Sequence, residues 1–357
     1  MRKAINLMVS TDHKGQGGVA TVVSTYADCG FLEANQIKLI ASHSSLDQAN
    51  KWRMLLRFMF ALRQLLYCFI VYRVGVVHIH MSSRGSYRRK AVIVRLVKRL
   101  GGKVILHLHG AEFHDFYRAE SCHVQLQIQQ TFALADHVLV LSTQWLSWVQ
   151  QTFGRFQGVS VLYNAVPSLD LDRQLAEPGS IAFLGRLGAR KGVGDLIQAF
   201  ALVKQRCPNA QLFLAGDGDL NTYQTLAKRL GVANAVHCLG WISGQAKLNL
   251  LSKTDIYCLP SYNEGFPMGV IEAMSAGIAV VASRAGGIPD AITDGDQGRL
   301  VNAGDVAGLA LALGDLIENR IENQRVAAEG KQKFSENFSL QAVIPQLQTL
   351  YDELLTS

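Results

Sequence analysis

Short apolar runs rich in β-branched residues alternate with longer helical stretches along almost the whole chain of 357 residues. This alternation is typical of parallel sheets with helices on both faces. The chain is too long for one comfortable core and about right for two such domains. The predicted strands are Ala4–Ser10, Gln36–Ser42, Val76–Met81, Lys103–His109, His137–Ser142 and Val159–Tyr163, and then Ser180–Leu187, Gln211–Ala215, Ala235–Leu239, Asp255–Pro260 and Ile278–Ala282. We therefore predict an α/β protein made of two Rossmann-like, doubly wound domains.

A segment with little periodicity separates the two predicted domains. Residues 164–180, NAVPSLDLDRQLAEPGS, contain two prolines and a glycine, which are turn and linker residues. We place the N-terminal domain at residues 1–168 and the second domain at residues 169–340. A helical stretch at residues 341–357 ends the chain, and we expect it to pack back toward the N-terminal domain.

Basic charge is concentrated in the first half of the chain. Residues 1–170 carry 19 Lys and Arg against 9 Asp and Glu, whereas residues 171–357 carry 16 against 19. The segment 51–103 alone holds 13 basic residues and no acidic one. Such a segment favours an anionic partner, which could be a membrane surface, a phosphate group or a nucleic acid.

Neither the N-terminus nor the cysteines indicate export. The apolar run Ala4–Val9 is too short for a signal peptide, contains Asn6 and leads into a glycine-rich loop. The six cysteines are scattered without a C-x-x-C pair, which disfavours both a disulfide framework and a zinc site. We therefore expect reduced thiols in a cytoplasmic protein.

Two glycine-rich turns each follow a predicted strand and precede a predicted helix. In GQGGVA, Gly17 and Gly18 allow a close approach of the backbone, and the helix that follows offers free N–H groups to a phosphate. The acidic residue that a dinucleotide fingerprint requires after the second strand is absent, so NAD binding is disfavoured. In FLGRLGARKG, Arg186 and Lys191 flank a turn and suit a diphosphate, although a solvated basic loop has the same composition.

A histidine-rich segment, ILHLHGAEFHDF at residues 105–116, follows another predicted strand. Strand alternation puts His107 and His109 on one face, with His109 at the strand end. The H-x-H spacing with nearby acids matches no strong zinc motif, so we expect no metal ion here. We favour a polar cluster that lines a sugar pocket, with His107 as a buried core histidine.

Two glutamates in SYNEGFPMGVIEAMSAG, at residues 261–277, are separated by seven residues. Pro267 suits the first turn of a helix, which puts Glu264 just before the positive helix end and Glu272 inside the helix. Both carboxylates can then contact one elongated ligand, with Glu264 at the reacting end and Glu272 further back. The alternative is one carboxylate that stabilises the helix dipole and one surface glutamate.

Two Asp-Gly-Asp segments resemble the D-x-D motif of metal-dependent sugar transferases. They are Asp217 to Asp219 and Asp294 to Asp296. Because Asp-Gly is ordinary turn chemistry, we interpret both segments as turns and not as metal ligands.

Five segments together resemble a family-4 retaining glycosyltransferase of GT-B fold, of the type that serves bacterial surface polysaccharides. In chain order the segments are GQGGVA, HLHG, GRLGARKG, LAGDGD and EGFPMGVIEAMSAGIAVVASRAGGIPD. The glutamate pair, followed by the sequence GGIP at residues 286–289, is the most specific part. The resemblance spans nearly the whole chain and implies two facing Rossmann-like domains.

The resemblance implies a role for each matching residue at the reacting end of the donor. Arg186 and Lys191 would hold the diphosphate, together with the amides of Gly17 and Gly18. His109 would lie near the donor sugar. The implied catalytic residues are thus His109, Glu264, Arg186 and Lys191.

The same resemblance implies contacts to the rest of the donor and to the acceptor. Glu264 would contact the donor sugar, and Glu272 would bind the ribose hydroxyls. Asp12 or Glu112 would shape the acceptor side. The remaining donor-binding residues would be Trp241 and Ile242 near the base, and Gly265, Phe266 and Met268 through their main-chain amides.

The implied reaction retains the configuration of the sugar without a covalent intermediate. The leaving nucleoside diphosphate gains negative charge, which Arg186, Lys191 and the loop amides stabilise. The acceptor hydroxyl attacks from the face that the diphosphate leaves. The donor would be a sugar linked to UDP or GDP, and no metal or other cofactor would be required.

This interpretation gives a possible function to the basic segment in the first half of the chain. KWRMLLRFMFALRQLLYCFIVYR mixes cations with aromatic residues, and its longest charge-free run, Gln64–Tyr72, is too short to span a bilayer. The segment can lie on the inner face of the cell membrane, beside a saccharide acceptor linked to polyprenyl diphosphate. A plain helix that covers a sheet would have a similar composition.

Two other functions stay open at this point. A nucleotide-sugar epimerase of the same fold would need acid and base residues near C2 of the sugar, and the sequence singles out none. A non-enzymatic nucleic-acid-binding protein would use the basic half. Its usual motifs are not apparent and its cations are interleaved with apolar residues, so we expect no nucleic-acid partner.

Overall fold

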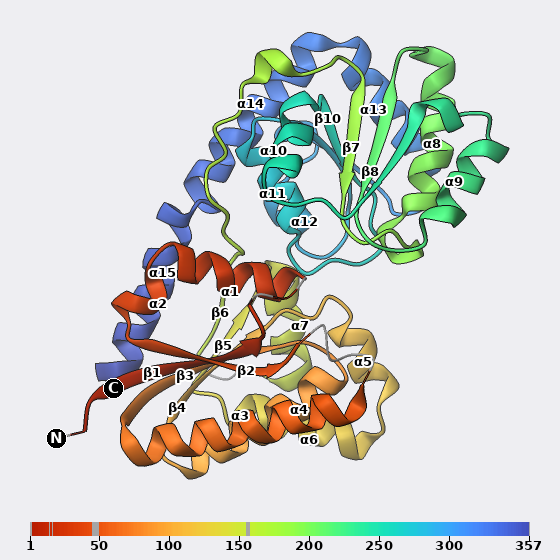
Figure 1. Ribbon diagram of the computed structural model, residues 1–357. Coiled ribbons are helices and arrows are strands. Elements are labelled where there is room, and N and C mark those ends of the chain that lie inside the picture. The colour runs from red at the N-terminus through yellow and green to blue at the C-terminus, as the bar shows by residue number, and fades with distance from the viewer. Residues whose placement is uncertain (1, 14, 16, 45–49, 155–157, 357) are drawn as a thin grey trace. The chain divides into compact units, whose positions relative to one another are not determined.

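The computed structural model describes residues 2–356 except residues 14, 16, 45–49 and 155–157. The chain forms two compact units, which are considered separately (Figure 1). Unit 1 comprises Met1–Ala165 and Val343–Ser357, and unit 2 comprises Val166–Ala342. The first boundary lies three residues before the one placed by sequence, and the second lies two residues after it.

Unit 1 is built on six parallel strands in the order β2-β1-β3-β4-β5-β6. The strands are β1 (Ala4–Thr11), β2 (Ile37–His43), β3 (Arg73–Met81), β4 (Lys103–Leu108), β5 (His137–Val140) and β6 (Val159–Val161). Figure 1 shows α1 and α2 on one side of this sheet and α3, α4 and α6 on the other. The helices are α1 (Gly18–Asp28), α2 (Phe31–Ala34), α3 (Lys51–Val71), α4 (Gly85–Arg99), α5 (Phe113–Ala119), α6 (Cys122–Ala133), α7 (Thr143–Phe153) and α15 (Leu340–Thr356).

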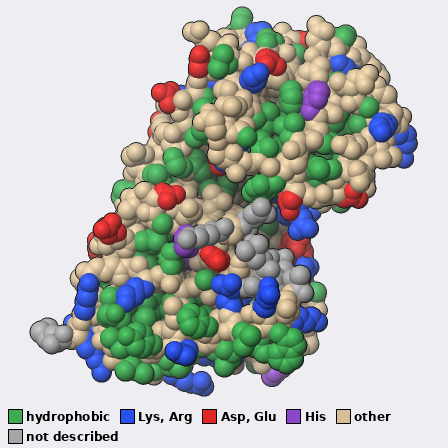
Figure 2. Space-filling model, viewed as in Figure 1, with side chains coloured by type: hydrophobic (Ala, Val, Ile, Leu, Met, Phe, Trp, Pro, Cys, Tyr) green, Lys and Arg blue, Asp and Glu red, His purple; other side chains and the backbone are tan. Residues whose placement is uncertain are grey.

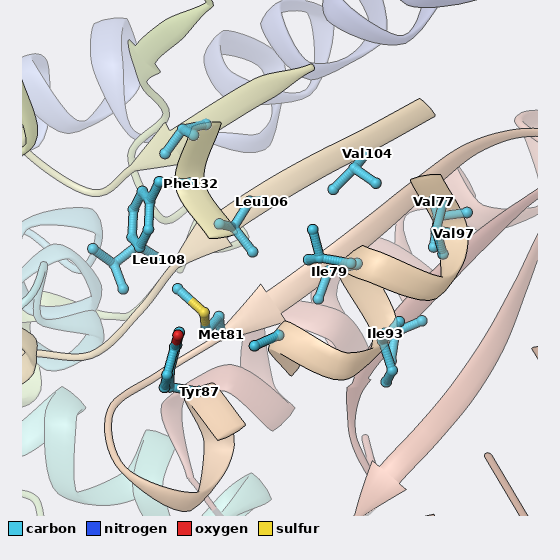
Figure 3. Packing of buried hydrophobic residues seen from close by; sticks show 14 of the residues in the cluster. Val77, Ile79, Met81, Tyr87, Ile93, Val97, Val104, Leu106, Leu108 and Phe132 are labelled. Atoms are coloured by element: carbon cyan, nitrogen blue, oxygen red, sulfur yellow. The ribbon is translucent and has the colours of Figure 1, made fainter. Parts of the chain in front are cut away.

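The core of unit 1 lies between the sheet and α4 and α6. Figure 3 shows alternate residues of β3 and β4 packed against side chains from these helices. These buried residues are Val77, Ile79, Met81, Val104, Leu106 and Leu108 from the strands and Tyr87, Ile93, Val97 and Phe132 from the helices. Since successive strand residues point to opposite faces, the intervening His78, His80 and His107 lie on the other face of the sheet. Burial of both faces explains why these strands are apolar almost throughout.

The C-terminal helix α15 returns to unit 1. The hydroxyl of Tyr351 lies 3.1 Å from His78 Nδ1, and the Tyr351 ring meets Phe31 edge-on at a centroid distance of 5.4 Å. Gln348 and Asn35 exchange side-chain hydrogen bonds of 2.7 and 3.0 Å. These contacts attach α15 to α2 and β3.

Unit 2 is also built on six parallel strands, in the order β12-β11-β10-β7-β8-β9. The strands are β7 (Ser180–Leu184), β8 (Gln211–Ala215), β9 (Val236–Gly240), β10 (Ile256–Leu259), β11 (Ala279–Ser283) and β12 (Arg299–Val301). The helices are α8 (Val193–Arg206), α9 (Leu220–Arg229), α10 (Gly244–Lys253), α11 (Met268–Ser275), α12 (Ile288–Ala291), α13 (Val306–Glu318) and α14 (Arg320–Asn337). With two parallel, helix-covered sheets, the predicted α/β class is confirmed.

Strand β12 is the one strand of unit 2 that the sequence analysis missed. It has three residues and pairs only with β11, at the edge of the sheet. So short a run shows no alternation of apolar and polar residues, and its strand conformation depends on pairing with a neighbour that is distant in sequence.

Helix α3 corrects one expectation. Among the described residues it is the helix that is long and apolar enough, by length and composition alone, to cross a membrane. The expectation that charges interrupt it too often is wrong on that measure, because residues 54–71 contain only Arg57 and Arg63. In the fold α3 covers β2, and it buries Ala61, Leu65 and Cys68. Only 17% of its most apolar window is buried, so most of its apolar surface faces outward.

Candidate active site

The candidate site of unit 2 lies where two neighbouring strands end. Strands β7 and β10 are adjacent and parallel, so the loops that follow them meet at one edge of the sheet. The amide of Tyr262 donates to the carbonyl of Arg190 at 2.8 Å, and the Arg190 guanidinium donates to the carbonyl of Asn263 at 2.8 Å. These bonds hold the two loops together.

Lys191 and Glu264 meet across these two loops. The Lys191 ammonium lies 2.5 Å from Glu264 Oε1, and the two side chains are 16% and 7% exposed. A largely buried carboxylate is stable only with such a partner. The structure therefore brings together Lys191, which is predicted to bind the diphosphate, and Glu264, which is predicted to bind the sugar.

Two glycines let the loops approach this closely. Gly192 has a φ of +67°, and a Cβ there would lie 2.1 Å from the carbonyl oxygen of Pro260. Gly286 has a φ of +56°, and a Cβ there would lie 1.8 Å from the carbonyl oxygen of Glu264. Any larger residue at either position would push the Glu264 loop out of place.

Glu272 lies in the second turn of α11, behind Glu264. The Glu272 carboxylate forms an ion pair with Lys247 at 2.8 Å, and the Glu272 side chain is 13% exposed. Neither glutamate is a surface residue, which removes that part of the alternative interpretation. Pro267 occupies the N-cap of α11, with a ψ of 120°, and not the first helical turn as expected. The helix starts one residue later because the extended backbone at Pro267 carries the chain in from the Glu264 loop.

Both glutamates surround one buried phenol. Tyr257, on β10, is fully buried and donates to the carbonyl of Leu184 at 3.3 Å. Burial raises the pKa of Tyr257 well above its usual value, and the charges of Glu272 and Glu264 raise this pKa further. The hydroxyl group between these charges is therefore neutral.

Arg186 lies in different surroundings from Lys191. Its side chain is 76% exposed, and its Nε is 3.9 Å from Asp217. The Asp-Gly-Asp segments carry structural hydrogen bonds. Asp219 caps α9 through the amide and hydroxyl of Thr222, and Asp294 accepts from Arg284 at 2.6 Å.

The remaining predicted donor ligands of unit 2 differ in exposure. Trp241 is about half exposed and Ile242 is partly buried. The Phe266 side chain is buried against Phe338, so any contact to a donor would come from its backbone. Met268 is the first residue of α11, where N–H groups have no acceptor within the helix. Gly265 accepts from the amide of Gly287 at 2.8 Å.

The candidate residues of unit 1 lie at the carboxyl ends of its strands. Gly17 and Gly18 begin α1 and line a cavity of about 160 Å³. Gln16, within the same motif, lies outside the described residues. The backbone amide of His109 donates to the carbonyl of Met81 at 2.7 Å. The Nε2 atom of His109 lies 2.8 Å from Nδ1 of His80. Burial lowers the pKa of His109 to about 3, so its imidazole is neutral.

Four histidine rings pack against one another: His78 and His80 on β3, His107 on β4, and His109 just after β4. His107 is buried, as predicted, and its Nδ1 lies 3.1 Å from His78 Nε2. One nitrogen from each of His78, His80 and His107 lies within 4.8 Å of the others, so these three could together hold a metal ion. The sequence analysis assigned roles only to His107 and His109. The same H-x-H pattern in VHIHM was the signal for the other two.

The predicted acceptor-side residues of unit 1 have basic neighbours. The Asp12 carboxylate lies 3.9 Å from Arg57 and 4.0 Å from His13. The Glu112 carboxylate lies 3.7 Å from Arg84.

Sequence comparison assigns the chain to a known family. Residues 173–333 match the family model of the glycosyl transferases group 1. An N-acetyl-alpha-D-glucosaminyl L-malate synthase of Bacillus anthracis is 32% identical over 297 residues, which cover 78% of this chain and 75% of the synthase. The chain belongs to the glycosyl transferases group 1 family.

Other similarities are shorter or more remote. An MMP alpha-(1->4)-mannosyltransferase of Mycolicibacterium hassiacum is 34% identical over 167 residues, which cover 46% of this chain and 40% of the mannosyltransferase. The chain thus matches less than half the length of this relative. The Anabaena protein HepE, solved with UDP and glucose, matches with a TM-score of 0.75 and 19% identity over 99% of this chain and 100% of HepE. At that identity the match shows the fold alone, and it confirms the predicted GT-B type.

Two lysines of this group 1 glycosyltransferase escaped the sequence analysis. Lys247 is the partner of Glu272, and Lys90 is a fully buried lysine of α4. Neither belongs to a recognisable motif. Their positions follow from which helix packs beside which strand, and local sequence does not reveal this.

Proposed function

We propose that this group 1 glycosyltransferase moves a sugar from a nucleotide-sugar donor to a saccharide acceptor, with retention of configuration. The proposal rests chiefly on the buried Lys191–Glu264 pair at the ends of β7 and β10. In this pair, an ammonium that could bind a diphosphate is in direct contact with a carboxylate that could bind sugar hydroxyls. The UDP and glucose bound to HepE, a protein of the same fold, support a donor of this class.

The pair suggests how the donor is recognised. In the free protein, the Lys191 ammonium forms an ion pair with the Glu264 carboxylate. A diphosphate would compete for the Lys191 ammonium, which frees the Glu264 carboxylate to accept hydrogen bonds from sugar hydroxyls. The ammonium then stabilises the negative charge that grows on the leaving diphosphate, and the acceptor hydroxyl attacks from the same face. Glu272, further along α11, would accept from the ribose.

The proposed reaction requires no metal ion. Lys191 and the more exposed Arg186 supply positive charge in unit 2. Asp219 and Asp294 already serve a helix cap and an ion pair. These interactions favour a turn role for both Asp-Gly-Asp segments.

We further propose that α3 rests on the inner face of the cell membrane, where the acceptor would be linked to polyprenyl diphosphate. Figure 2 shows hydrophobic and basic side chains gathered on the part of unit 1 that includes α3. Arg53 and Arg63 are exposed among them. The exposed large apolar residues of this helix are Trp52, Leu55, Leu56, Met59, Phe60, Leu66, Tyr67, Ile70 and Val71. An apolar face with interspersed cations suits the surface of an anionic bilayer. Attachment to the membrane beside a lipid-linked acceptor would be consistent with a role in surface polysaccharide assembly.

A donor screen tests the proposed activity. The protein would be incubated with UDP- and GDP-linked sugars and polyprenyl-diphosphate saccharides, and release of nucleoside diphosphate and the anomeric configuration of the product would be measured. We expect an α-linked product from an α-linked donor. An isomerised donor in the absence of acceptor would instead indicate an epimerase. Glu264→Gln serves as the control with strongly reduced activity.

A further inference from the structure

A second side-chain contact joins the two segments that meet in the candidate site of unit 2. The Tyr262 hydroxyl donates to the Asp195 carboxylate at 2.8 Å. Asp195 lies in the first turn of α8, four residues after Lys191, and Tyr262 lies two residues before Glu264. The Tyr262–Asp195 bond therefore links the same two segments as the Lys191–Glu264 ion pair.

The phenol of Tyr262 is a suitable donor for this contact. The hydrogen bond to Asp195 is the main cause of the raised pKa of Tyr262, so the hydroxyl keeps its proton at neutral pH and donates to the carboxylate. A hydrogen bond with one charged partner is stronger than one between neutral groups. A Cβ at Gly304 would lie 2.8 Å from the same hydroxyl, so the turn before α13 also packs closely against it.

Asp195 is a fixed point in the fold of unit 2. Its neighbours in α8 are fully buried, which anchors this end of the helix in the core; they are Val193, Leu196 and Ile197. Tyr262, by contrast, is 51% exposed. Loss of the Tyr262 hydroxyl should therefore change the stability of the whole unit little, while it detaches the loop from α8.

Two further hydrogen bonds join this loop to the Lys191 turn. The amide of Tyr262 donates to the carbonyl of Arg190, and the Arg190 guanidinium donates to the carbonyl of Asn263. Arg190 directly precedes Lys191 in the 3₁₀ turn Ala189–Lys191, so these two bonds would follow any movement of that turn. The bond to Asp195 instead reaches past the turn to the anchored helix.

The ends of the Glu264 loop, which comprises residues 260–267 between β10 and α11, are held separately. The carbonyl of Ser261 accepts from the Ser283 hydroxyl, and the carbonyl of Gly265 accepts from the amide of Gly287 at 2.8 Å. The bond from Tyr262 to α8 thus acts on the middle of the loop, next to Glu264.

We propose that Tyr262 is a positioning residue for Glu264. Its bond to Asp195 holds the middle of the Glu264 loop on α8 after a donor has separated Glu264 from Lys191. The Glu264 carboxylate then stays where it can accept hydrogen bonds from the donor sugar. This inference rests on the proposed function, in which the donor breaks the Lys191–Glu264 pair.

Amide hydrogen exchange of residues 261–266 tests the two links without turnover. The four proteins are the wild type, Lys191→Met, Tyr262→Phe and the variant with both substitutions. Each single variant keeps one link, so each should raise the exchange rate only slightly. The double variant lacks both links. Its exchange should be faster than the product of the two single effects by at least about tenfold, the scale of one charge-assisted hydrogen bond. An exchange rate equal to that product would overturn the proposal.

Kinetics test the consequence for the proposed reaction. Tyr262→Phe should lower kcat by about tenfold and keep the wild-type affinity for free UDP or GDP, because only the sugar-binding carboxylate is displaced. Asp195→Leu should have the same effect. Asp195→Asn keeps an oxygen that accepts from the phenol, so it should retain most of the activity. Tyr117→Phe in unit 1 is the control, since it removes a hydroxyl that accepts from Gln129 at 3.1 Å.

A direct contact between Tyr262 and the substrate would give a different pattern. Tyr262→Phe would then lower kcat or nucleotide affinity while Asp195→Leu left both unchanged, which would contradict a positioning role. Wild-type kcat in Tyr262→Phe would contradict it as well. If the wild type transfers no sugar from any donor, the proposed function fails. The exchange measurement still decides in that case whether Tyr262 and Lys191 jointly hold the loop.

Discussion

Lys191 and Glu264 are 73 residues apart in sequence, and their charged groups are 2.5 Å apart in the fold. The contact exists because β7 and β10, which precede the two residues, are neighbours in the sheet of unit 2. Each residue neutralises the other in a largely buried place. In the proposed reaction, a donor would separate these two groups, one to bind its diphosphate and the other its sugar.

The pair should contribute to stability as a unit. Lys191→Met or Glu264→Gln alone leaves one poorly solvated charge without a partner, so each should lower the free energy of unfolding by about 1–3 kcal/mol. This is below the range for fully buried pairs because Lys191 is 16% exposed. The double variant should lie closer to the wild type than the sum of the two losses. Urea unfolding of all four proteins measures the coupling.

An exposed pair provides the matched control for this cycle. Arg206 and Glu318 lie 2.6 Å apart in the same unit, with side chains 38% and 48% exposed. Solvent screens such a pair, so its double-variant cycle should show little coupling. If the Lys191–Glu264 cycle were equally additive, the buried pair would not be the stabilising unit described here.

Substitution of the two glutamates should change different kinetic constants. Glu272→Gln should weaken binding of free nucleoside diphosphate and raise KM, because ribose contacts change little during the reaction. Glu264→Gln should keep nucleoside diphosphate affinity but lower kcat by roughly 100-fold, the scale of one transition-state contact. Calorimetry and steady-state kinetics of both variants decide between the roles, and the opposite pattern would exchange the two assignments.

Lys90 should give unfolding a distinct pH dependence. Its pKa is about 7 in the folded protein and about 10.5 in the unfolded chain. Between these values the unfolded chain binds one more proton, so the free energy of unfolding should rise with pH across this window. Lys90→Met should lack that rise and should be more stable than the wild type below about pH 7. Urea titrations of both proteins at several pH values measure the difference, and parallel curves would contradict the burial of a charged Lys90.

The exposed face of α3 should bind lipid. Leu56→Glu with Ile70→Glu changes two residues that are 66% and 68% exposed, so the fold should be unaffected while binding to anionic vesicles falls. Ile321→Glu in α14 is the control, since Ile321 is 82% exposed and lies outside α3. Vesicle flotation measures the bound fraction. Equal binding by all variants would remove α3 from any membrane contact.

Removal of metal ions should leave transfer nearly unchanged. Asp219 is a helix cap, so Asp219→Ala should lower stability without a matching loss of kcat. The measurement is activity with and without EDTA, together with thermal unfolding of the variant. Activity that disappears with EDTA and returns with Mg²⁺ or Mn²⁺ would show that a metal ion takes part.

Much of the fold follows from local sequence alone. Apolar, β-branched runs between helical stretches predicted eleven of the twelve strands, because strands buried on both faces must be apolar throughout. Parallel sheets place functional loops after strands, so the glycine-rich turns and the Glu264 segment could be found without coordinates. The family resemblance rested on the same segments and is confirmed by the comparisons.

What the sequence alone determined is therefore the succession of elements and the position of each candidate residue within its own loop. Only the tertiary structure decided which loops meet and what surrounds each charge. Local sequence contains no sign that Lys191 contacts Glu264, that Lys247 contacts Glu272 or that Lys90 is buried beside Ser42. Strand order and helix packing create these contacts between residues that are distant along the chain, and burial then gives the charges their effect.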